Sequence, residues 1–195
     1  MQRLITLLVV FFWGTLTLLE ASVYTKAVVG YQVQSPAEKT SATHFDPGVL
    51  VGLAVGKKWD PLKLELELAV RANEATSGCC ETCHETETYG VGALLCHLIY
   101  EQRCQTPLSY QVGLGAGLSR NAYFREFFSE SETGVWAAPS FEVLGGVGYD
   151  IGPCRTFGIE YRFFGSSINS LSCEEAGRRL FLLSHSLAFT FTHRF

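Results

Sequence analysis

The residues of this chain that could do chemistry gather in one short segment, Cys79-Cys80-Glu81-Thr82-Cys83-His84. Cys80, Cys83 and His84 have the C-x-x-C-H spacing of c-type haem attachment, in which two thioethers hold the porphyrin and the histidine ligates iron. Three thiolates and an imidazole could equally bind a metal ion. A third interpretation is a surface loop closed by disulfides.

The N-terminal residues bear on this choice because they predict export. Met1-Gln2-Arg3 is a short basic head, Leu4 to Leu19 is an uncharged apolar run, and Glu20-Ala21-Ser22 offers small residues for cleavage. This order is typical of a secretory signal peptide, with an uncleaved membrane anchor as the alternative. We expect residues 1–21 to be the signal peptide and residues 22–195 to be the mature domain.

Export favours the disulfide interpretation over haem or metal, because oxidising compartments convert thiols to disulfides. Met1, the sole methionine, would leave with the signal peptide and could not ligate a haem. We therefore expect no cofactor, with Cys80, Cys83 and His84 as weak metal candidates only. An odd seventh cysteine, Cys96, leaves at least one thiol free or paired with another chain. The disulfide candidates are Cys79, Cys80, Cys83, Cys104, Cys154 and Cys173.

Composition excludes some classes of function and narrows the fold. The chain has 195 residues and a net charge of −4, and no basic run suggests a nucleic-acid partner. Hydrophobic residues make up 47%, yet after the predicted signal peptide no uninterrupted apolar stretch approaches the length of a membrane helix. If the mature protein crosses a membrane, strands must carry it across.

Strand-like segments recur along the whole mature chain, and the connections between them alternate between short turns and long polar loops. Eight such strands predict an all-β fold, an eight-stranded antiparallel up-and-down transmembrane β-barrel. An even count puts both mature ends on the short-turn side. The predicted strands are residues 23–33, 48–56, 63–71, 88–101, 109–119, 137–149, 155–164 and 186–195.

The polar face of these strands favours a membrane barrel over a soluble lipocalin-like barrel, which would invert the same pattern. Residues 63–71 alternate apolar side chains with charged ones, and residues 109–119 alternate them with glycines. Glycines weaken an exposed strand surface but leave room for long side chains inside a narrow barrel. We therefore expect a lumen filled by paired charges, with no open channel. The predicted lumen charges are Lys26, Lys63, Glu65, Glu67, Arg71, Glu142, Glu160, Arg162 and Arg194.

Aromatic residues fall mostly near the predicted strand ends, where membrane barrels place their aromatic girdles. Two places resist this scheme. Residues 94–100 are apolar on both faces, which leaves the register open and suggests a bulge. His193 interrupts the apolar face of the last strand. The aromatics expected in the girdles include Tyr24, Trp59, Tyr89, Tyr110, Trp136, Tyr149 and Phe195.

The signal peptide, the eight strands, the glycine-rich polar face and the last strand, Ser186 to Phe195, together resemble the small eight-stranded outer-membrane β-barrels of the OmpA/OmpX/opacity type. That resemblance implies a bacterial outer-membrane location, with periplasmic termini and extracellular long loops. It also implies that Phe195 is an assembly signal read by the barrel assembly machinery. Members act as structural anchors, adhesins or surface-resistance factors.

An enzyme of this shape is the alternative, because lipid A deacylases that are eight-stranded barrels use a His-x-Ser pair. Here Ser184-His185-Ser186 places the residues adjacent, so the histidine and the serines lie on different faces. We therefore predict a non-enzymatic barrel with a structural or adhesive role. Its expected partners are outer-membrane lipid, the barrel assembly machinery, and host-surface or envelope proteins reached through loops or disulfides.

Overall fold

The computed structural model describes residues 22–36, 43–80, 83–127, 130–169 and 179–195. Within these ranges the chain forms nine strands, all paired antiparallel. None of the described residues belongs to a helix with the length and hydropathy needed to cross a membrane. The strands are β1 (Ser22–Pro36), β2 (Thr43–Phe45), β3 (Gly48–Trp59), β4 (Leu62–Cys80), β5 (Cys83–Arg103), β6 (Leu108–Phe127), β7 (Glu130–Gly152), β8 (Arg155–Asn169) and β9 (Arg179–Arg194).

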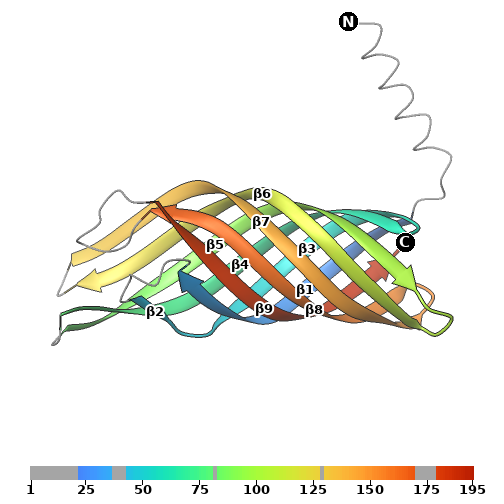
Figure 1. The fold of residues 1–195 in the computed structure, drawn as a ribbon, viewed down its shortest axis with the longest axis horizontal. Coiled ribbons are helices and arrows are strands. Elements are labelled where there is room, and N and C mark those ends of the chain that lie inside the picture. Colours follow the sequence, from blue (N-terminus) through green and yellow to red (C-terminus); the bar gives the residue numbers. More distant parts are fainter. Residues whose placement is uncertain (1–21, 37–42, 81–82, 128–129, 170–178) are drawn as a thin grey trace, which may run out of the picture.

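Eight of these strands close into a barrel, which confirms the predicted fold class. Each of them pairs with its neighbours along the chain, β9 pairs with β1, and pairing of β4 with β5 completes the circle. The remaining strand, β2, has three residues and lies outside this circle, where it pairs with residues 75–77 of β4. Figure 1 shows the strands winding around the barrel at a tilt, with the C-terminus at the end where the short turns lie. We call this the turn end.

Two of the four predicted long loops, residues 73–87 and 120–134, are largely regular β-hairpin, which corrects the sequence prediction. β4 and β5 stay paired from the barrel out to Cys80 and Cys83, and β6 and β7 out to Phe127 and Glu130. β8 and β9 stay paired out to Asn169 and Arg179. A hairpin that extends past the closed barrel has no barrel interior on one side, so it needs no consistently apolar face, and the alternation that marks a strand is lost although the backbone pairing continues.

Burial alternates along most of the length of the barrel strands and separates two surfaces. Apolar side chains point outward and are exposed: Leu53 is 69% exposed and Phe189 62%. Charged and small side chains point inward, and Glu67 and Arg162 are both 0% exposed. The apolar surface therefore lies on the outside of the barrel, and the polar groups fill the inside.

The structure gives β5 a single register where the sequence left it open. His97 and Ile99 face the lumen, while Cys96 and Leu98 face outward. Pairing with both neighbouring strands runs through residues 94–100 without a shift, so the suggested bulge is wrong. The segment reads as apolar on both faces because its inward positions carry Leu95 and Ile99 beside His97.

Candidate functional site: the charged lumen

The lumen contains three groups of polar side chains, stacked along the barrel. The central cluster comprises Lys26, Arg71, Arg162, Glu65, Glu67, Glu142, Glu160 and His97, all of them buried. A neutral layer lies on the hairpin side and includes Gln32, Asn73, Tyr89, Ser119, Asn121 and Ser166. The turn-end pocket is lined by Tyr24, Lys58, Lys63, Glu101, Arg103, Ser109, Gln111, Gly148, Thr156, Gly158, Thr190, Thr192 and Arg194.

Arg162 on β8 organises the central cluster by contacting three carboxylates. Its Nη1 donates to Glu67 Oε1 at 2.6 Å and to Glu142 Oε1 at 3.1 Å. Its Nη2 donates to Glu67 Oε2 at 3.0 Å and to Glu160 Oε2 at 2.6 Å. These partners come from β4, β7 and β8, so one guanidinium joins opposite walls of the barrel.

Lys26 and Arg71 supply the other two cations of the central cluster. Lys26 Nζ lies 2.6 Å from Glu65 Oε1 and 3.4 Å from Glu160 Oε1. Arg71 donates to Glu142, and its guanidinium carbon lies 4.0 Å from the centroid of the Phe164 ring. Buried charges are tolerated only when they are paired. Each cation of the network has a carboxylate partner, although Arg71 Nε and Nη1 are buried without a hydrogen-bond partner among the described residues.

His97 is a member of this cluster that sequence reasoning missed. Its Nε2 lies 3.3 Å from Glu142 Oε1 and its Nδ1 lies 3.8 Å from Glu65 Oε1. Gly115 lies opposite His97 on β6, and a Cβ at Gly115 would overlap the imidazole ring. The glycine therefore provides the space in which the histidine reaches across β6 to Glu142 on β7. Fixing the register of β5 would have placed His97 inside.

Glu65, Glu67 and His97 are also the group best suited to hold a metal ion among the described residues. Their donor atoms lie within 4.8 Å of one another. Both carboxylates, however, already serve cations of the cluster, Glu65 with Lys26 and Glu67 with Arg162. A divalent ion would have to displace these pairs, so we assign the three residues to the ion network.

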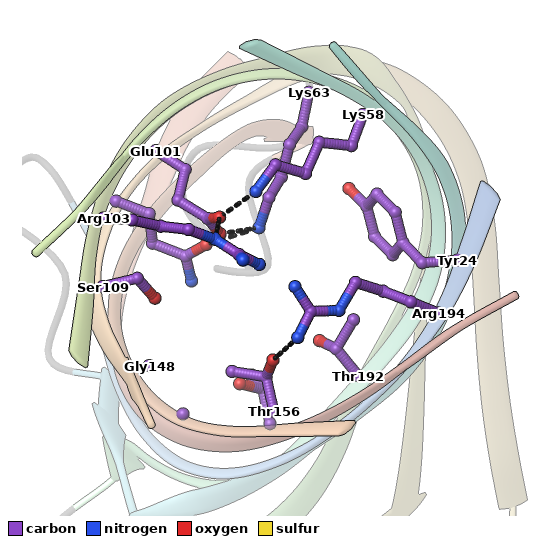
Figure 2. A pocket seen from close by; sticks show the side chains of 13 residues that line it. Tyr24, Lys58, Lys63, Glu101, Arg103, Ser109, Gly148, Thr156, Thr192 and Arg194 are labelled. Carbon is purple, nitrogen blue, oxygen red and sulfur yellow. Dashed lines mark hydrogen bonds and ion pairs between the residues drawn. The ribbon is translucent and has the colours of Figure 1, made fainter. Parts of the chain in front are cut away.

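The turn-end pocket is a second ionic group, separated from the central cluster by Gln111. Gln111 Nε2 donates to Glu160 at 2.8 Å, while its Oε1 accepts from Lys63 at 3.5 Å. Figure 2 shows Lys58, Lys63, Arg103 and Arg194 pointing into the same open centre. Arg194 Nη2 donates to Asp150 Oδ1 at 2.9 Å.

The predicted lumen charges therefore separate into two places. The structure puts Lys63 and Arg194 in the turn-end pocket and the other seven in the central cluster. Sequence reasoning missed Lys58, Glu101, Arg103 and Asp150, which stand at or beside turns, where the alternation ends. Lys58 could have been found, because it continues the inward series of Ala54 and Gly56.

Two aromatics predicted for the girdles lie in the lumen instead. Tyr24 and Tyr89 are each 1% exposed, and their hydroxyls donate to Glu65 at 3.0 Å and to Asn121 at 2.8 Å. Position along a strand suggested a girdle, but strand parity decides the face, and Tyr24 shares the parity of Lys26. The aromatics that do face outward near the turn end include Tyr100, Tyr110, Tyr149, Phe157 and Phe195.

The cysteine predictions are only partly reached by the described residues. Cys96, Cys104 and Cys154 are exposed and carry free thiols. Cys80 and Cys83 occupy directly opposed backbone positions at the end of the β4–β5 hairpin. Cys173, the predicted signal peptide and the side chains of Cys79 and His84 lie outside the described parts, so the disulfide map stays a prediction.

Residues 184–186, which raised the enzyme alternative, are split between the two surfaces. Ser184 and Ser186 are buried in the lumen, whereas His185 is exposed on the outside. There His185 Nδ1 lies 2.5 Å from the hydroxyl of Tyr161. The histidine therefore cannot activate either neighbouring serine as a nucleophile, which requires hydrogen-bond reach.

No protein-family model matches the chain, and no curated protein matches it in sequence. Solved structures do resemble it in fold. Neisserial surface protein A superposes with a TM-score of 0.61 at 16% identity, covering 90% of this chain and 99% of that one. OprG from Pseudomonas aeruginosa gives a TM-score of 0.53 at 13% identity, covering 91% and 96%.

Ail of Yersinia pestis, solved with the heparin analogue sucrose octasulfate, gives a TM-score of 0.52 at 11% identity, covering 90% of this chain and 98% of that one. At these identities the likeness concerns the fold. The fold of this chain is that of the small eight-stranded outer-membrane β-barrels, as the sequence predicted.

Proposed function

We propose that this chain is a non-enzymatic outer-membrane barrel whose interior is closed by ion pairs and whose hairpins carry a structural or adhesive role. One observation carries the proposal: apolar side chains cover the outside of the barrel while charged ones are buried inside. A soluble barrel that binds an apolar ligand would have these faces reversed. Only a lipid environment makes the observed arrangement favourable.

The closed interior argues for a role outside the lumen. Buried side chains from opposite walls meet in the central cluster, as the contacts of Arg162 show. An eight-stranded barrel is only wide enough to be filled by side chains. Passage of solutes would require breaking this network. We therefore place the function in contacts made by the hairpins, since connecting segments commonly carry binding residues.

The proposal extends to orientation, and it is supported by the usual architecture of outer-membrane barrels. Barrels of this type have short periplasmic turns and longer extracellular connections. The turn end, with connections at 60–61, 104–107 and 153–154, would then face the periplasm, and the hairpins that end near Cys80, Phe127 and Asn169 would face outward.

Epitope insertion tests both location and orientation. A tag placed between Phe127 and Glu130 should be detected by antibody on intact cells. A tag placed between Cys104 and Leu108 should be detected only after the outer membrane is permeabilised. Equal detection of both tags on intact cells, or recovery of the protein in the soluble fraction, would contradict the proposal.

The enzyme alternative is tested separately, by mass spectrometry of lipid A from strains with and without the protein. We expect identical acylation patterns, because His185 faces away from Ser184 and Ser186. A lipid A acylation pattern that differs in the strain without the protein, and that is restored by the wild-type protein but not by His185→Ala, would establish a lipid-modifying enzyme instead.

A further inference from the structure

The turn-end pocket holds more cations than its carboxylates can balance. Lys58, Lys63, Arg103 and Arg194 line it, and Glu101 is its one lining carboxylate. Asp150 lies beside it and contacts Arg103 and Arg194. Asp60 contacts Lys58 at 2.8 Å but is 75% exposed in the turn outside the pocket, where water screens its charge.

The contacts show how two carboxylates are shared among four cations. Glu101 is within ion-pair distance of Lys58 at 2.5 Å, of Lys63, and of Arg103 Nε at 3.2 Å. Asp150 receives Arg194 at 2.9 Å and Arg103 Nη1 at the longer distance of 3.7 Å. Several guanidinium and ammonium protons are therefore left without an anionic acceptor.

The opposite wall adds neutral hydroxyl groups around the same open centre, of which the Thr156 hydroxyl donates to Asp150. Ser109, Thr156 and Thr192 line it (Figure 2), and Arg194 Nε is buried with no hydrogen-bond partner among the described residues. Two inward-facing glycines leave space for these hydroxyls. A Cβ at Gly148 would come within 2.7 Å of Ser109 Oγ, and one at Gly158 within 2.5 Å of Thr190 Oγ1.

We propose that the turn-end pocket binds a phosphate group. Two arginines, two lysines and the hydroxyls of Ser109 and Thr192 converge on one space, and guanidinium groups match tetrahedral oxyanions with paired hydrogen bonds. The cavity between these side chains has a volume of about 20 Å³. Arg103, whose side chain is 41% exposed, forms the open side by which an anion enters.

The phosphate could be free inorganic phosphate or the headgroup of a phospholipid at the same end of the barrel. The pocket belongs to the folded barrel itself, so the inference does not depend on a structural or adhesive role of the hairpins. A failure of the epitope experiment would leave phosphate binding unaffected.

Titration of the folded full-length chain with inorganic phosphate tests the site directly. The barrel is refolded in phosphate-free detergent micelles, and the arginine Nε–Hε resonances are followed by NMR. We expect saturable shifts for Arg103 and Arg194 and none for Arg155, which is exposed at the same end but does not line the pocket. Arg103→Gln should weaken binding at least tenfold, whereas Arg155→Gln should leave it unchanged.

Arg103 is suited to this test because its side chain is the most exposed of the four cations, so its replacement should leave the barrel folded. Heat-dependent electrophoretic mobility verifies folding of each variant. If folded wild type shows no saturable shift, or if Arg103→Gln and Arg155→Gln titrate alike, the proposal is wrong.

A second arm distinguishes the two sources of phosphate. The barrel is placed in nanodiscs of phosphatidylglycerol in phosphate-free buffer, and inorganic phosphate is then added. If the arginine resonances in nanodiscs are already shifted from their positions in phosphate-free micelles, and added phosphate does not move them further, the lipid headgroup is the ligand. Shifts that appear only on addition of phosphate identify the free ion.

Discussion

At the scale of single residues, the central cluster depends on Arg162, which joins Glu67, Glu142 and Glu160. Removing one partner of a buried ion network leaves uncompensated charge and typically costs about 3–5 kcal/mol. We expect Arg162→Met to destabilise the barrel by about that amount in urea unfolding from lipid vesicles. Arg155→Met, at an exposed arginine on the same strand, should change stability by less than about 0.5 kcal/mol.

A second residue-scale prediction concerns the space that Gly115 leaves for His97. A Cβ at Gly115 would overlap the buried ring, so Gly115→Ala should destabilise the barrel by about 1–3 kcal/mol. Gly52 is the matched control, because it also faces the lumen but a Cβ there would meet its neighbours at 3.4 Å, an ordinary contact. The same unfolding assay should show Gly52→Ala at or above wild-type stability.

The glycine pair separates two explanations of the glycine-rich inner face. If Gly115→Ala and Gly52→Ala have equal effects, the glycines act through backbone freedom alone, and the assigned position of His97 is wrong.

At the scale of elements, β5 carries the least obvious register in the barrel. Cys96 faces outward between Leu94 and Leu98, so a fluorophore on this thiol should lie in the acyl-chain region. We expect strong quenching by brominated lipid in a variant that keeps Cys96 alone. A variant that keeps only Cys104, an exposed turn residue, provides the control and should be quenched little. Equal quenching of the two labels would contradict the assignment of Cys96 to the outward face of β5.

How much of this architecture the sequence could predict depended on whether one face of a strand is consistently apolar. β4 shows it from Leu64 to Val70, and its strand, faces and lumen charges could all be predicted. β5 carries lumen residues that are themselves apolar, Leu95 and Ile99, so only pairing with β4 and β6 fixes its faces and brings His97 into the cluster.

The ends of the elements were harder for two physical reasons. Lys58, Arg103 and Asp150 stand where strands give way to turns, and their inward direction depends on the closing of the barrel. Residues 73–80 of β4 carry no consistently apolar face, so sequence alternation ends at Asn73 while strand pairing continues to Cys80. Both features depend on contacts across the barrel that a linear pattern does not contain.

At the scale of the whole molecule, the filled lumen predicts the absence of a stable pore. Insertion into a planar bilayer, verified by heat-dependent mobility of the same preparation, should give no porin-sized conductance steps. Arg162→Met, which opens the centre of the network, is the variant in which leak currents would first appear. Regular large steps from the wild type would mean that the buried ion pairs do not close the barrel.

The central claim is that the outer surface of this barrel faces lipid, and folding from urea tests it most directly. Unfolded chain is diluted either into buffer or into phospholipid vesicles, and β-structure is followed by circular dichroism with electrophoresis of unheated samples. We predict β-structure and a compact, heat-sensitive band with vesicles only, because buffer leaves side chains such as Leu53, Leu114 and Phe189 exposed to water. A monomer that folds cooperatively in buffer without lipid would contradict the account.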